Sequence, residues 1–157
     1  MEMEVIHLSG QLDWLEVKKA SAELPSDASA RYHAYPYLHE EMSAAMTIAD
    51  LAVSRAGASI LGEMPYFGLP AVLVPYPHAW RYQRVNAGYL ADRGAAVIVE
   101  DDLIGEKLLD VVGDLMRDAQ RREEMGRAMK SLAHPQAADC LASLLIGLAK
   151  NSPREGC

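Results

Sequence analysis

Short apolar runs alternate with segments of helical periodicity along most of the chain. Runs of this kind predict buried strands, and apolar positions three and four residues apart predict helices. The expected strands cover residues 4–8, 30–35, 51–54, 71–74 and 95–99. The expected helices cover residues 13–24, 38–49, 60–67, 81–93, about 103–116, about 119–132 and 136–148. Strands that alternate with helices are typical of the α/β class with a parallel sheet.

The central stretch reads as strand, glycine turn, helix, glycine turn and strand, from Leu51 to Pro75. This order predicts a βαβ unit whose first turn lies at the carboxyl end of a strand, where open α/β sheets bind ligands. Gly57 permits backbone angles that other residues avoid, and Ala56, Ala58 and Ser59 leave room for a close approach. The helix that follows offers unpaired N–H groups to a phosphate. Ser59 is the expected N-cap.

Glu63 lies one turn into this helix, at the edge of an apolar face. A carboxylate there interacts favourably with the helix dipole, which is a purely structural explanation. A second interpretation is that Glu63 accepts hydrogen bonds from two ribose hydroxyls beside a bound phosphate. The residue types alone leave both interpretations open.

A second cluster of chemistry-bearing residues follows the next strand, between Pro75 and Asn86. Gln83 and Asn86 are three residues apart and therefore present two amides on one helical face. Amides donate and accept hydrogen bonds, which suits sugar hydroxyls and an acetamido group. The alternative is an ordinary solvated helix face.

In the C-terminal part of the chain, Asp101 and Asp102 are expected to cap a helix. The leucines at 141, 144, 145 and 148 are expected to face the core: Leu141, Leu144, Leu145 and Leu148.

Composition narrows the classes of function. The chain has 157 residues and a net charge of −7, which disfavours general nucleic-acid binding. Its two cysteines and the group His39-Glu40-Glu41 do not form a pattern that predicts a metal site, and no Walker lysine or GxSxG motif occurs. We therefore expect no metal and no cofactor. A reducing cytoplasmic setting fits best, because the start lacks the features of a secretory signal.

Four motifs that follow one another along the chain resemble the C-terminal half of the MurG family of glycosyltransferases. They are ADLAVSRAGASILGE (49–63), GLPAVLVPYPH (68–78), QRVNA (83–87) and GAA (94–96). The resemblance extends from about residue 5 to residue 148. This family transfers GlcNAc from UDP-GlcNAc to lipid I, which makes the lipid II of peptidoglycan. The resemblance implies a GT-B architecture, in which two Rossmann-like domains face each other and the C-terminal one holds the donor.

The resemblance also implies roles for individual residues. The donor loop and helix start would comprise Ala58, Ser59, Ile60, Leu61, Gly62 and Glu63, whose main-chain amides would face the diphosphate and sugar. Glu63 would hold the ribose, Gln83 and Asn86 would contact the GlcNAc, and the main chain at His39 would pair with uracil. The supporting positions would be Met42, Arg55 and Gly57. Two positions depart from the family pattern, because His39 replaces an apolar residue and Tyr82 replaces a histidine or glutamine.

The family has an N-terminal acceptor domain and a first βα unit that precede the matched region. We therefore expect residues 1–150 to form an N-terminally truncated donor-binding domain, with a flexible tail over 151–157. No catalytic residue is expected here, and the chain is expected to be inactive alone. Lipid I would be reached only through the missing domain or a partner chain, at the inner face of the cell membrane. An exposed sheet edge would permit self-association.

Three alternatives remain at this stage. The chain could be the donor-binding subunit of a split GlcNAc transferase, as in the eukaryotic dolichol-linked system. It could be a non-catalytic module that binds a nucleotide sugar. It could also take a different sugar, as related glycolipid synthases do.

Overall fold

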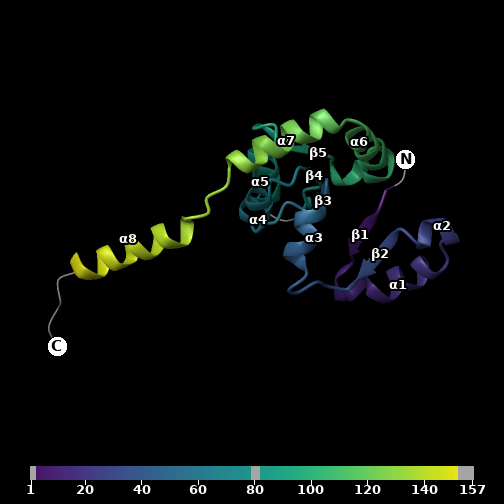
Figure 1. Cartoon of the computed structure of the whole chain (residues 1–157), viewed down its shortest axis with the longest axis horizontal. Helices are drawn as coiled ribbons and strands as arrows, with labels where there is room; N and C mark the ends of the chain where they lie inside the picture. Colours follow the sequence, from purple (N-terminus) through teal and green to yellow (C-terminus); the bar gives the residue numbers. More distant parts are fainter. Residues whose placement is uncertain (1–2, 79–81, 152–157) are drawn as a thin grey trace. The chain divides into compact units, whose positions relative to one another are not determined.

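The computed structural model describes residues 3–78 and 82–151, and its chain divides into two compact units (Figure 1). The first unit, residues 1–48, contains β1 (Val5–Leu8), α1 (Gly10–Ala22), α2 (Ser26–Ser29), β2 (Tyr32–Tyr35) and α3 (Met42–Ile48). The second, residues 49–157, contains β3 (Ala52–Ser54), α4 (Ile60–Phe67), β4 (Ala71–Leu73), α5 (Tyr82–Ala91), β5 (Ala96–Ile98), the 3₁₀ turn η1 (Asp101–Leu103), α6 (Ile104–Arg117), α7 (Ala119–Ser131) and α8 (Ala137–Asn151). The predicted helix start at Arg81 and the predicted tail after Asn151 lie outside the described residues.

In the first unit, β1 and β2 pair in parallel, with Val5 opposite Tyr32 and Leu8 opposite Tyr35. The connection between them is α1, which packs on β2 together with α2. The predicted strand over 30–35 therefore exists but begins two residues later. The parallel pairing confirms the α/β expectation for this part of the chain.

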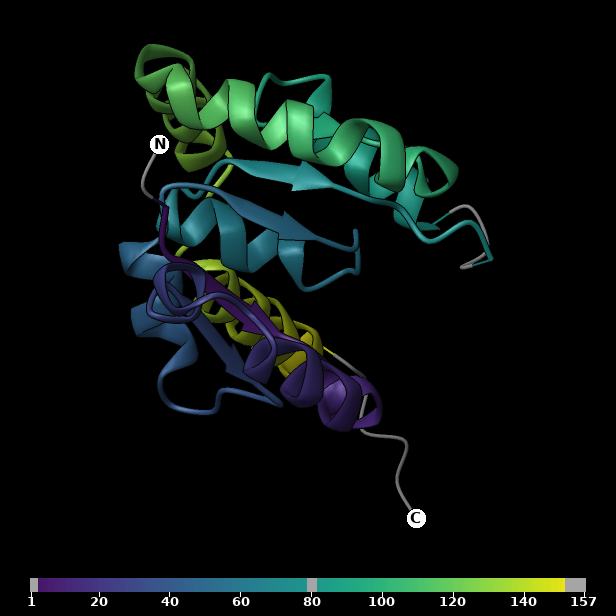
Figure 2. The same ribbon diagram turned by 90° about the vertical axis from the view of Figure 1, so that its right-hand side faces the viewer.

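In the second unit, the three strands are parallel in the order β3-β4-β5, and α4 and α5 are the crossover helices. Side chains of a strand point alternately to the two faces of a sheet. On one face, Ala71 and Leu73 belong to a buried cluster with residues of α4, α5 and α7. On the other, Val72 and Val74 pack with Leu115 of α6 and Met125 of α7. The sheet is thus covered on both sides, and Figure 2 shows the green helices α6 and α7 beside one of its faces.

Two of the expectations for the C-terminal part are wrong. Asp101 and Asp102 lie in η1, and neither α6 nor η1 has a side-chain cap. The leucines of α8 do not face a core, because Leu141, Leu144, Leu145 and Leu148 are between 60% and 68% exposed. Their spacing correctly predicts a helix, but apolar periodicity does not show whether another part of the protein covers the apolar face of that helix. Among the described residues, no helix is long and apolar enough to cross a membrane.

Candidate functional site

The carboxyl ends of β3, β4 and β5 meet at one edge of the second unit's sheet, because the three strands are parallel. Arg55 follows β3, the loop through Tyr76 follows β4, and Asp101 follows β5. The turn into α4 and the beginning of α5 lie on the same edge, since each follows one of these strand ends. This edge is the candidate site.

The turn into α4 places unpaired amides at a helix N-terminus. The N–H groups of Leu61, Gly62 and Glu63 bond back to the carbonyls of Ala58 and Ser59 at 3.0–3.2 Å. Those of Ala58, Ser59 and Ile60 make no hydrogen bond to any residue that the structure describes. Three of the six predicted amides are therefore available to an anion, together with the positive end of the α4 dipole.

Ser59 and Gly57 in this turn differ from the sequence expectation, whereas Ile60 agrees with it. Ser59 precedes α4 with helical backbone angles and makes no side-chain cap bond. Gly57 does not use its conformational freedom, because the positive φ angles among the described glycines occur at Gly10, Gly68 and Gly94. Ile60 is only 5% exposed and packs in the core, so it can offer a ligand only its main chain.

Glu63 is exposed in the first turn of α4, where its charge complements the helix dipole. Its carboxylate has no hydrogen-bond or ion-pair partner in the described parts of the chain. A free carboxylate beside unpaired main-chain amides is compatible with either interpretation given above for Glu63.

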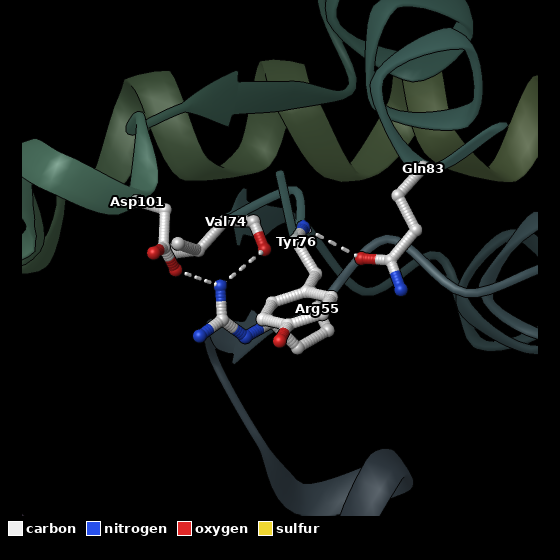
Figure 3. Close-up of polar contacts among 5 residues, drawn as sticks. All are labelled: Arg55, Val74, Tyr76, Gln83 and Asp101. Atoms are coloured by element: carbon white, nitrogen blue, oxygen red, sulfur yellow. Dashed lines mark hydrogen bonds and ion pairs between the residues drawn. The ribbon is translucent and has the colours of Figure 1, made fainter. Parts of the chain in front are cut away.

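Both predicted sugar-binding amides hold the main chain of the site. Asn86 donates from Nδ2 to the carbonyl oxygen of Ala56 at 3.0 Å, which ties α5 to the turn before α4. Gln83 accepts through Oε1 from the N–H of Tyr76 at 2.8 Å, which ties α5 to the loop after β4. The second polar atom of each amide makes no hydrogen bond to a described residue. Figure 3 shows the Gln83 amide nitrogen turned away from Tyr76. The spacing rule predicted one shared face but could not predict these two bonds.

Replacing Asn86 by alanine is expected to lower the free energy of unfolding by about 1–2 kcal/mol, because the carbonyl of the buried residue Ala56 loses its donor. Chemical denaturation measures this loss. Exposed Gln136, whose side chain makes no hydrogen bond to a described residue, provides the matched control. An equally stable Asn86→Ala protein would contradict a structural role for this bond.

Arg55 makes contacts with residues at the ends of two other strands (Figure 3). Its Nη1 donates to the carbonyl of Val74 at 3.3 Å and forms an ion pair with Asp101. Its guanidinium carbon lies 5.4 Å from the centre of the Tyr76 ring. Asp101 was expected only to cap a helix, and Tyr76 had no role of its own within the predicted cluster, although both residues lie shortly after strands.

A second ion pair joins α5 to the end of β5, between Arg84 and Glu100. The hydrogen bond and the charge of Glu100 raise the pKa of Arg84 further above its ordinary value. The pair is solvent-exposed and therefore adds little to stability.

No group of three or more His, Cys, Asp or Glu side chains that could hold a metal ion occurs among the described residues.

His39 and Met42 belong to the first unit, whereas the other predicted donor-binding residues belong to the second. The exposed His39 ring lies 4.7 Å from the ring of Tyr37, centre to centre. Its carbonyl accepts a hydrogen bond from the N–H of Met42 at 3.3 Å, just before α3. The pairing of this main chain with uracil stays a prediction.

Residues 1–141 match the Glycosyltransferase family 28 C-terminal domain. The chain belongs to glycosyltransferase family 28. Similar curated proteins are the UDP-N-acetylglucosamine–N-acetylmuramyl-(pentapeptide) pyrophosphoryl-undecaprenol N-acetylglucosamine transferases of Roseiflexus sp. (strain RS-1) and Chlorobaculum parvum. Both are 40% identical, over 91% and 93% of this chain and over 37% and 40% of their own lengths.

The fold is similar to the crystal structure of Acinetobacter baumannii MurG, with a TM-score of 0.78 and 28% identity over 94% of this chain and 41% of that one. The expected architecture is thus confirmed as the C-terminal half of a GT-B glycosyltransferase fold. The chain spans about two fifths of the length of the curated relatives that it matches.

Proposed function

We propose that this chain is the UDP-GlcNAc-binding part of a glycosyltransferase that transfers GlcNAc to lipid I and thereby makes lipid II. The names of its relatives describe an N-acetylglucosaminyl transfer to an undecaprenyl-linked muramyl pentapeptide. The observation that carries the proposal is the set of three unpaired amides at the start of α4, with the free carboxylate of Glu63 one turn away.

In the proposed site, different residues bind different parts of UDP-GlcNAc. The diphosphate lies at the amides of Ala58, Ser59 and Ile60, because a helix N-terminus favours negative charge. Glu63 accepts hydrogen bonds from the two ribose hydroxyls. Gln83 offers its remaining amide nitrogen to the GlcNAc, and Asn86 offers its remaining oxygen.

The reaction that this arrangement serves is an inverting displacement. The acceptor hydroxyl attacks the anomeric carbon, the bond from that carbon to the diphosphate oxygen breaks, and UDP leaves with the bonding electrons. The helix end stabilises the negative charge that develops on the leaving oxygen. We assign no catalytic base to this chain, and the base and the lipid I site would come from an N-terminal domain or a partner chain at the inner face of the membrane.

Residues 1–150 are proposed to act as one donor-binding domain. Both sheets of the described chain end in a strand with an unpaired edge, since β1 pairs only with β2 and β3 pairs only with β4. Val53 on β3 is 49% exposed. Such edges favour pairing with another chain, so self-association would appear as an apparent mass that rises with protein concentration.

Titration calorimetry with UDP-GlcNAc, UDP and UDP-glucose tests the proposed function. Binding of UDP-GlcNAc that exceeds binding of UDP-glucose is expected, because the Gln83 and Asn86 amides would contact the acetamido group. The absence of binding at millimolar ligand, in a chain shown to be folded by its circular dichroism spectrum, would reject a donor-binding role for the isolated chain.

A further inference from the structure

One side chain at the candidate site follows the first strand of the sheet and contacts residues at the ends of the other two. Arg55 directly follows β3, bonds the carbonyl of Val74 at the end of β4 and pairs with Asp101 after β5 (Figure 3). The ring of Tyr76 lies beside its guanidinium. Arg55 therefore connects the loop that leads into α4 with the loop that leads into α5.

The Asp101 contact decides where the guanidinium lies. The bond from Arg55 to Val74 is long at 3.3 Å, and the contact with the Tyr76 ring is not directional in the way that a hydrogen bond is. The pair with Asp101 is a charge-assisted hydrogen bond, the strongest kind among these three contacts. Without it, Arg55 would keep only the two weaker contacts.

The exposure of the pair argues against a main role in stability. The Arg55 and Asp101 side chains are 48% and 32% exposed, and pairs with this much solvent access contribute little to folding. The pair joins the Arg55 loop to η1, and the same guanidinium bonds Val74, so Arg55 contacts both of the loops that border the site. These are the loop that carries the amides of Ala58, Ser59 and Ile60, and the loop whose Tyr76 N–H bonds Gln83.

We propose that Asp101 is a positioning residue, which acts through Arg55 to hold the Arg55–Ile60 and Val74–Tyr76 loops in the geometry that accepts the anionic donor. The proposal rests on the donor site proposed above, but its structural part can be tested without a ligand. Asp102 provides a matched control, because it is the neighbouring aspartate in η1, is exposed and has no partner among the described residues.

The first test uses nuclear magnetic resonance on the whole chain with Asp101→Asn and Asp102→Asn. In Asp101→Asn, the side-chain N–H signals of Arg55 are expected to lose their protection, and amide exchange at Tyr76 is expected to rise by about threefold or more. The thermal midpoint and the exchange of Val72 in the core should stay unchanged, and Asp102→Asn should match the wild type. Unchanged Arg55 and Tyr76 signals in Asp101→Asn, or exchange that rises equally throughout the chain, would overturn the proposal.

The second test asks whether Asp101 acts through Arg55. In an Arg55→Gln background, Asp101→Asn should cause no further change in the exchange of Tyr76, whereas a role independent of Arg55 would add its own effect and overturn the proposal. With donor present, Asp101→Asn is expected to weaken UDP-GlcNAc binding by roughly threefold to tenfold through lost preorganisation. Equal affinity of Asp101→Asn and the wild type would overturn the link to the donor. If the wild type itself binds no UDP-GlcNAc, the proposed function is rejected. The ligand-free exchange measurements then still show whether Asp101 positions the two loops.

Discussion

Replacing Glu63 by alanine is expected to weaken the binding of UDP-GlcNAc and of UDP by a similar factor, about a hundredfold or more. Hydrogen bonds to a charged group contribute about 1.5–3 kcal/mol, and the carboxylate is proposed to accept two of them from the ribose. Both ligands carry the ribose, so both should lose affinity. Titration calorimetry with the two ligands measures the effect.

Glu106 on α6 is the matched control for this experiment. It is also an exposed glutamate in the first turn of a helix, so Glu106→Ala removes the same charge from the same kind of position. The control should bind both ligands like the wild type. Equal effects of the two substitutions, or no effect of Glu63→Ala, would favour the structural interpretation in which Glu63 only complements the α4 dipole.

Replacing Leu73 by alanine is expected to lower the free energy of unfolding by about 2–5 kcal/mol. Leu73 is 0% exposed on β4, the central strand of the three-stranded sheet, and packs in the cluster formed with α4 and α5. Its truncation would leave a cavity beneath the two helices that begin at the candidate site. Chemical denaturation followed by circular dichroism measures the loss.

Leu109 supplies the comparison for Leu73. It is 83% exposed on α6, so Leu109→Ala should change the free energy of unfolding by less than about 0.5 kcal/mol. A Leu73→Ala protein as stable as Leu109→Ala would contradict the assignment of β4 as the core strand.

The elements of the second unit could be predicted because local signals agree there. Gly68 takes a left-handed conformation with φ +67° and ends α4, as the Gly-Leu-Pro segment predicted. The wholly buried residues of β4 follow the apolar run of 71–74. Sequence patterns of this kind are short-range, because each depends on residues within a few positions of one another.

The details of the site depend on contacts between residues distant in sequence, which patterns do not show. The pairs Arg55–Asp101 and Asn86–Ala56 join residues 46 and 30 positions apart. The residue types at Gln83 and Asn86 suggested sugar recognition, whereas one atom of each side chain is already used to hold main chain. The same holds for α8, because the spacing of its leucines predicted the helix but did not predict that these leucines are exposed.

Mapping of backbone amide shifts during titration with UDP-GlcNAc shows directly whether the donor binds at the α4 turn. We expect the largest shifts at Ala58, Ser59, Ile60 and Glu63, and we expect them to saturate with a single dissociation constant. A contrary result would be shifts that gather at a different place on this unit, such as the hollow lined by Gly94, Arg121 and Met125, while the α4 turn stays unchanged. In that case the carboxyl edge of the sheet would not be the donor site of this chain.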